Sequence, residues 1–173
     1  MEAYFDNSAT TIVTDSVKDI VVKTMTEDFG NPSAMHMVGV KAEKYIKEAQ
    51  ENIAKILKVD PKEIFFTSGG TESNNMAIIG TAMANKRKGN KIITTSVEHS
   101  SVLATMKYLE EQGFEVIYLP VDRYGVVQME ALEKEMTEDT ILVSTMYVNN
   151  EVGSVQPVAE AASIVKAYNK NIL

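Results

Sequence analysis

One segment, Phe65 to Asn75, constrains the fold more than any other part of the sequence. Its beginning, Ile64 to Thr67, is apolar and partly β-branched and predicts a buried strand, whereas the residues from Thr71 onward have helical periodicity. Gly69 and Gly70 lie between the two and let the backbone approach a ligand closely. A strand, a glycine turn and a helix start in this order predict an anion cradle suited to phosphate. The competing interpretation is an ordinary glycine turn before a capped helix.

Two further apolar stretches, Ile92 to Ser96 and Ile141 to Val148, read as strands and also end in polar clusters. The first continues into Glu98 and His99, and the second into Asn149 to Gly153. Ligands of open parallel sheets bind at the carboxyl ends of the strands, so we expect these clusters and the glycine turn to share one crevice. Taken singly, a histidine after a strand is more often a hydrogen-bonded structural residue, and an Asn-Asn pair is more often a turn.

The remaining pattern predicts an α/β fold with three layers, a mostly parallel sheet flanked by helices. We expect an N-terminal segment over residues 1–14, a helical segment over 15–58, and alternating strands and helices over 59–173. Thr14 or Asp15 is the expected cap of the first helix. The other predicted helices cover Asp15–Glu27, a stretch ending at Leu57, Val102 to about Gly113, and about Gln128–Met136. A last helix is opened by Gln156-Pro157 with the proline in its first turn, and a strand is expected over Phe114–Leu119.

Composition narrows the function classes. A length of 173 residues with 45% hydrophobic content predicts one domain with a sizeable core, and a net charge of -7 argues against nucleic acid as the main partner. With no cysteine there is no disulfide and no thiolate ligand, and the two histidines lack metal-ligand spacing, so no metal site is expected. No apolar run approaches a membrane span of about 20 residues and no signal peptide is recognisable, which predicts a cytoplasmic protein.

Five motifs in order resemble those of the pyridoxal-phosphate enzymes of the class V aminotransferase family, specifically the cysteine desulfurases. They span nearly the whole sequence, and their common order makes the resemblance specific. The motifs are Tyr4–Thr11, Phe29–Ser33 with His36 nearby, Ser68–Asn75, Glu98-His99 and Val148–Gly153.

The resemblance implies the N-terminal part of the large domain of a fold-type I enzyme, with pyridoxal 5′-phosphate as cofactor. It assigns the cofactor phosphate to Gly70 and Thr71. His99 would stack on the pyridine ring and relay protons as a catalytic residue, and Asn150 would hydrogen-bond the phenolic oxygen. Asn31 would lie in a loop on the substrate side.

The resemblance also implies an activity, the conversion of L-cysteine to L-alanine with transfer of sulfur to an enzyme persulfide. The expected partners are a sulfur-acceptor or scaffold protein, for example in iron–sulfur cluster assembly, and a second subunit in a homodimer. The family's pyridinium aspartate, Schiff-base lysine and catalytic cysteine have no counterpart up to Leu173. We therefore expect the N-terminal part of such an enzyme, inactive by itself.

Three alternatives stay open. A selenocysteine lyase or a class V aminotransferase would use the same scaffold. A non-catalytic remnant would act only by binding a partner or a phosphate ligand. Nucleotide binding is disfavoured because the sequence has neither a P-loop nor a dinucleotide-binding glycine fingerprint.

Overall fold

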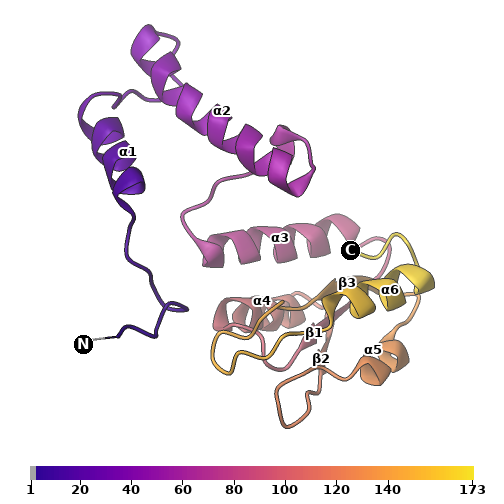
Figure 1. The fold of residues 1–173 in the computed structure, drawn as a ribbon. Helices are drawn as coiled ribbons and strands as arrows, with labels where there is room; N and C mark the ends of the chain where they lie inside the picture. Colours follow the sequence, from indigo (N-terminus) through magenta and orange to yellow (C-terminus); the bar gives the residue numbers. More distant parts are fainter. Residues whose placement is uncertain (1–2) are drawn as a thin grey trace. The chain divides into compact units, whose positions relative to one another are not determined.

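The structure is a computed structural model that describes residues 3–173. The chain forms two compact units, one up to Phe66 and the other Thr67–Leu173 (Figure 1). Each unit is described by itself.

The first unit is helical. It contains α1 (Asp15–Thr26), α2 (Met37–Leu57) and a short 3-10 helix, η1 (Pro61–Glu63). The two long helices confirm the prediction from periodicity. Thr14 occupies the N-cap position of α1 but its side chain does not cap the helix, because its hydroxyl bonds the Ser16 hydroxyl at 3.2 Å instead.

The second unit alternates helices and strands. Its three strands form a parallel sheet in the order β2-β1-β3, which confirms the predicted α/β class. Its elements in chain order are α3 (Gly70–Asn85), β1 (Lys91–Thr95), α4 (Ser100–Glu111), β2 (Glu115–Leu119), α5 (Met129–Glu135), β3 (Thr140–Ser144) and α6 (Val158–Tyr168).

The sheet of this unit is the middle of three layers (Figure 1). Successive side chains of a strand point to opposite faces, and β1 divides its two isoleucines accordingly. Ile92 packs with residues of α3 and α4, whereas Ile93 packs with residues of α5 and α6. Both isoleucines are fully buried, so β1 is the centre of the core.

Three local predictions are wrong. Ile64–Thr67 forms no strand, since its backbone has no partner strand in the described residues, and Phe65 is 73% exposed. The third strand ends at Ser144 rather than Val148, because the N–H of Met146 bonds a side chain instead of a neighbouring strand. Pro157 is the N-cap of α6 and so precedes its first turn.

Among the described residues, no helix combines the length and the apolar character that crossing a membrane requires.

Candidate functional site

The first turn of α3 offers unpaired backbone donors. The first hydrogen bond of this helix runs from the N–H of Ser73 to the carbonyl of Gly69 at 3.1 Å. Within residues 3–173, the N–H groups of Gly70, Thr71 and Glu72 have no hydrogen-bond partner. Free N–H groups at the positive end of a helix dipole favour an anion. Gly70 and Thr71 therefore stand at a helix start, as the sequence predicts.

The space in front of this turn fits a phosphate group. A Cβ atom added at Gly69 or at Gly70 would meet no heavy atom of residues 3–173 within 4 Å. The hydroxyl of Thr71 adds a donor beside the backbone groups. Hydrogen-bond donors on an open, glycine-lined helix start are the donor set that a phosphate requires.

Side chains around the turn hold its shape. The Glu72 carboxylate accepts hydrogen bonds from the Ser68 hydroxyl at 2.6 Å and from the Ser68 N–H at 2.7 Å. The bond from the Ser68 side chain lowers the pKa of the Glu72 carboxyl, and the bond from its backbone acts in the same direction. The hydroxyls of Thr67 and Ser73 lie 2.6 Å apart. The turn is thus fixed before any ligand binds.

His99 is the N-cap of α4. Its Nδ1 atom accepts a hydrogen bond from the backbone N–H of Ser101 at 3.1 Å and lies 2.8 Å from the Ser101 hydroxyl. The ring is exposed, and its Nε2 atom has no hydrogen-bond partner among residues 3–173. His99 can therefore cap α4 through Nδ1 and still offer Nε2 for the predicted catalytic role, because the two roles use different nitrogens of the imidazole.

The structure brings His99 close to the helix of the glycine turn. Helices α3 and α4 pack together, and the side chain of Asn74 donates a hydrogen bond to the Ser101 hydroxyl at 2.9 Å. Ser101 in turn holds His99. The predicted phosphate turn and the predicted ring-stacking residue thus stand on neighbouring helix starts.

Asn150 lies in the segment after β3, and it is exposed. Its Nδ2 donates to the carboxylate of Glu151 at 2.8 Å. Within residues 3–173, no hydrogen bond joins Asn150 to His99 or to Thr71. The two strand ends are nevertheless adjacent, since β3 pairs with β1 in parallel. Its shared crevice with the glycine turn stays a prediction.

The neighbouring Asn149 is buried and structural. Its Nδ2 donates to the carbonyl of Val97 at 3.0 Å, which ties the segment after β3 to the segment after β1. Its Oδ1 accepts from the N–H groups of Glu151 and Val152 at 2.9 and 3.0 Å. Asn149 therefore stabilises the turn, whereas Asn150 is exposed to solvent.

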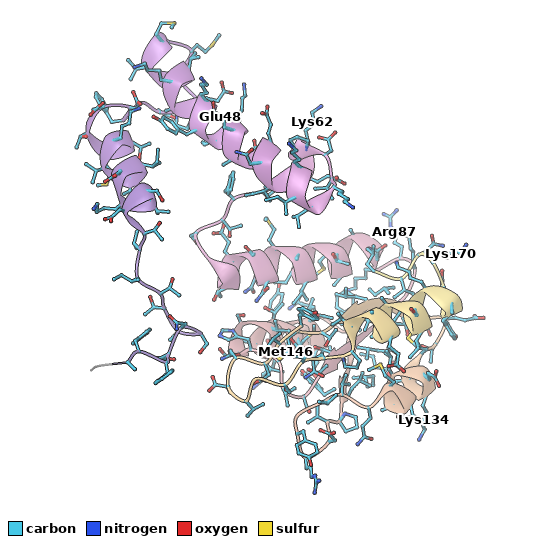
Figure 2. The ribbon with its side chains drawn as sticks, in the orientation of Figure 1. Glu48, Lys62, Arg87, Lys134, Met146 and Lys170 are labelled. Carbon is cyan, nitrogen blue, oxygen red and sulfur yellow. The ribbon has the colours of Figure 1, made fainter. Side chains whose placement is uncertain are left out.

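Sequence reasoning assigned no role to Glu98, although it precedes His99. The Oε1 atom of this buried residue accepts hydrogen bonds from the Thr95 hydroxyl and from the N–H of Met146, both at 2.8 Å. Met146, in the segment after β3, is labelled in Figure 2. Burial raises the pKa of the Glu98 carboxyl, and the two hydrogen bonds oppose that shift. The one sequence signal for this bridge is the position of an acidic residue directly after a strand, where a polar cluster begins.

Asn31 belongs to the first unit. Its Oδ1 accepts a hydrogen bond from the N–H of Ser33 at 2.9 Å, so the side chain builds the turn between α1 and α2. A Cβ atom at Gly39 would lie 2.7 Å from the Asn31 carbonyl oxygen, and this glycine therefore lets α2 approach the turn. The proposed substrate-side role of Asn31 stays a prediction.

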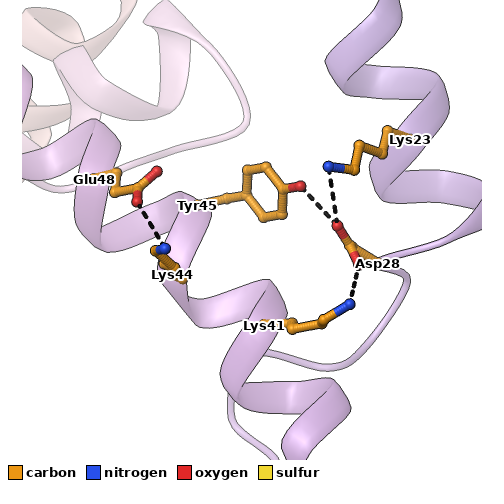
Figure 3. Close-up of a pocket in the computed structure, with 6 residues that line it drawn as sticks. All are labelled: Lys23, Asp28, Lys41, Lys44, Tyr45 and Glu48. Atoms are coloured by element: carbon orange, nitrogen blue, oxygen red, sulfur yellow. Dashed lines mark hydrogen bonds and ion pairs between the residues drawn. The ribbon is translucent and has the colours of Figure 1, made fainter.

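A charged hollow of about 270 Å³ also lies in the first unit, beside this turn (Figure 3). Buried Asp28 accepts a hydrogen bond from the Tyr45 hydroxyl at 2.7 Å and forms ion pairs with Lys41 at 3.3 Å and Lys23 at 3.8 Å. The bond from Tyr45 is the main cause that lowers the pKa of the Asp28 carboxyl. Its charges are paired, so this cluster joins α1 to α2 and offers no free group to a ligand.

The chain is similar in sequence to known proteins. "Cysteine desulfurase IscS 1" of Archaeoglobus fulgidus is 48% identical over 162 residues, which are 94% of this chain and 42% of that protein. "Cysteine desulfurase IscS" of Methanosarcina thermophila is 50% identical over 163 residues, 94% of this chain and 40% of that protein.

Solved structures are similar to the chain in fold. A "NIFS-like protein" matches with a TM-score of 0.95 and 48% identity, covering 100% of this chain and 48% of that one. "SspA in complex with cysteine" matches with a TM-score of 0.89 and 38% identity, covering 96% of this chain and 48% of that one. The chain thus spans less than half the length of each of these relatives. The profile of the aminotransferase class-V family matches residues 3–173, and the chain belongs to that family.

Proposed function

We propose that this chain is the N-terminal part of a pyridoxal-phosphate-dependent cysteine desulfurase. The observation that supports the proposal is the helix start at Gly70 and Thr71, whose unpaired donors belong to the helix that Asn74 links, through Ser101, to His99. The names of the most similar relatives support the choice among class V activities, and one structural neighbour is described as a complex with cysteine.

The roles proposed for Gly70, Thr71 and His99 use atoms that have no hydrogen-bond partner among residues 3–173. Gly70 and Thr71 hold the cofactor phosphate with backbone N–H groups and the Thr71 hydroxyl. The exposed imidazole of His99 stacks on the ring and moves a proton at Nε2. Asn150 exchanges its solvent-exposed bond to Glu151 for one to the phenolic oxygen of the ring. Asn31 lies on the substrate side.

Bound pyridoxal 5′-phosphate supplies an electron sink for bond breaking at the substrate. The proposed reaction takes L-cysteine to L-alanine and leaves the sulfur as a persulfide on a cysteine side chain, for delivery to a sulfur-acceptor or scaffold protein in the cytoplasm. The 173-residue chain contains no cysteine, so the persulfide must form on a residue outside it. We therefore propose that residues 1–173 alone are inactive.

Phosphate binding tests the site directly. Inorganic phosphate is titrated into the ¹⁵N-labelled chain, and the amide signals of Gly70, Thr71 and Glu72 are expected to move together. Because a hydrogen bond to a charged group contributes about 1.5–3 kcal/mol, Thr71→Ala should weaken binding roughly tenfold or more. Thr14→Ala, at the start of another helix, is the matched control. Movement of other amides only, with these three unchanged, contradicts the site.

Activity is a separate test. The purified chain is mixed with pyridoxal 5′-phosphate and L-cysteine, and alanine and sulfide are measured. The expected result is no alanine above the rate of free cofactor. Cysteine-dependent alanine release at an enzymatic rate, abolished by His99→Ala, would contradict the proposed inactivity of the chain alone.

We also propose that the chain self-associates as a homodimer. Helix α1 has no buried residue, and the side chains of Val17, Ile20, Val21 and Met25 are between 48% and 73% exposed. Apolar side chains gathered on one helix are typical of surfaces that bind another protein surface.

A further inference from the structure

A chain of hydrogen bonds joins Asn74 of α3 to His99. The Nδ2 group of Asn74 donates to the Ser101 hydroxyl at 2.9 Å. The Ser101 hydroxyl lies 2.8 Å from Nδ1 of His99, and the Ser101 N–H donates to the same nitrogen at 3.1 Å. Ser101 is buried, with only 8% of its surface exposed, whereas the imidazole that it holds is exposed.

A second connection runs beside the first. The Nδ2 group of Asn75 donates to the carbonyl of Thr71 at 2.8 Å, and its Oδ1 accepts from the Thr105 hydroxyl at 2.9 Å. That hydroxyl also lies 2.8 Å from the carbonyl of Ser101 and is shared between the two acceptors. Thr105 is 2% exposed. Both asparagines of the Ser68–Asn75 motif therefore connect the glycine turn to the start of α4.

The pattern of donors determines where the proton of a neutral His99 ring resides. The backbone N–H of Ser101 is a donor and nothing else, so the Nδ1 atom that it faces must be the acceptor. The proton of the neutral ring then resides on Nε2, the nitrogen that has no partner among residues 3–173. A helix cap needs only the backbone bond, whereas the hydroxyl and Asn74 add a connection from the neighbouring helix.

We propose that Ser101, held by Asn74, is a positioning residue that fixes the orientation and the tautomer of His99 from the phosphate-binding helix. The functional part of this proposal rests on the proposed role of His99, whereas the hydrogen bonds of Ser101 are independent of that role. In this arrangement the Nε2–H group of His99 faces away from its hydrogen-bond partners. The orientation of the imidazole is set from α3, the helix proposed to bind the cofactor phosphate. The His99 imidazole and the bound phosphate group would then be held at a fixed distance and orientation relative to each other.

Nitrogen NMR of the ¹⁵N-histidine-labelled chain tests this proposal. The chain has two histidines, and His36 is an internal reference because its Nδ1 atom likewise accepts a backbone N–H, that of Gly39, at 3.3 Å. In the wild-type chain we expect His99 to be mainly the Nε2–H tautomer. Ser101→Ala keeps the backbone bond but removes the hydroxyl, and the minor tautomer should increase roughly two- to tenfold. The signals of His36 should stay unchanged.

Three variants sharpen the test. Ser101→Thr retains the hydroxyl and should restore the wild-type signals. Asn74→Asp replaces the donor by an acceptor, so the Ser101 hydroxyl turns toward the carboxylate and the His99 signals should change again. Ser100→Ala, one residue away on the same turn, is the control and should change nothing.

The outcomes separate this inference from the proposed function. His99 signals that are identical in the wild-type chain, Ser101→Ala and Asn74→Asp would overturn it, and so would an equal response to Ser100→Ala. Binding of inorganic phosphate at residues 70–72 is measured on the same samples and should stay within about twofold in Ser101→Ala, since no donor to the anion is removed. If the wild-type chain does not bind phosphate but the His99 tautomer responds as expected, the result counts against the cofactor site and not against this inference.

Discussion

The Glu98 carboxylate bridges two strand ends by accepting a hydrogen bond from the backbone N–H of Met146 at 2.8 Å. Met146 follows β3, and Glu98 follows β1, so the bond fixes the segment before Asn150 against the segment before His99. The same Oε1 atom accepts from the Thr95 hydroxyl. The Glu98 side chain and the bond from Asn149 to the Val97 carbonyl together hold the two predicted site segments against each other.

Replacing Glu98 tests this bridge. Glu98→Ala leaves the Met146 N–H and the Thr95 hydroxyl without an acceptor, and each buried unpaired donor costs roughly 1–3 kcal/mol. Glu98→Gln keeps the accepting oxygen and should retain most of the free energy of unfolding, as measured with urea. Hydrogen exchange of the Met146 amide should accelerate in Glu98→Ala only. Equal stability of the two variants would contradict the bridge.

The Glu98 carboxyl also predicts a pH dependence of stability. Because burial raises its pKa in the folded chain above the ordinary value of 4.5, the folded state binds more protons than the unfolded state above that pH. Its contribution is therefore complete below about pH 4.5 and is lost as the pH rises through the folded-state pKa. The free energy of unfolding of the wild-type chain minus that of Glu98→Gln should fall over this window. A constant or rising difference would contradict the sign.

Two neighbouring threonines of β1 are expected to respond oppositely to the same substitution. Both are buried, but the Thr94 hydroxyl has no hydrogen-bond partner in the part of the chain that the structure describes, whereas the Thr95 hydroxyl donates to Glu98. Removing a buried unpaired hydroxyl relieves its desolvation cost, so Thr94→Val should raise the free energy of unfolding by about 1 kcal/mol. Thr95→Val should lower it by about as much. Urea unfolding of the two variants measures this contrast.

Local pattern was sufficient for most of the second unit. Apolar runs bounded by turns located β1, β2 and the first part of β3, and helical spacing located the helices between them. Ile64–Thr67 has the same apolar character but forms no strand, because a strand also requires a neighbour with free backbone groups. Hydrophobic periodicity indicates which side chains of a segment can be buried, but it does not indicate whether a neighbouring strand is available for pairing.

The candidate site was predictable only where its chemistry is local. Gly70 and Thr71 are recognisable because glycines, hydroxyls and a helix start follow each other directly in the sequence. The bond between Asn74 and Ser101 joins residues 27 positions apart and depends on how α3 packs against α4. No pattern in one segment could have shown it.

Two glycines offer a matched test of the turn that contains Asn31. A Cβ atom at Gly39 would lie 2.3 Å from the carbonyl oxygen of Ala34, whereas one at Gly80, in the middle of α3, would meet nothing within 4 Å. Gly39→Ala should cost about 1–3 kcal/mol by overpacking and move the Asn31 amide signal. Gly80→Ala should add up to about 1 kcal/mol, because alanine is the better helix former. Gly39→Ala that is as stable as the wild-type chain, with unchanged Asn31 signals, would contradict the close packing of this turn.

The exposed apolar side chains of α1 predict the behaviour of the chain in solution. Val17, Val21 and Met25 recur at helical spacing and lie on one side of the helix. Burying such a surface between two copies is favourable at about 25 cal/mol for each Å² removed from water, so the chain should sediment as a dimer or larger species at micromolar concentration. Val21→Glu places a charge within that surface and should shift the distribution toward monomer. Ser16→Glu adds the same charge at a more polar position of α1 and should leave it unchanged. A wild-type chain that sediments as a monomer, or an equal response to both substitutions, would contradict association through this helix.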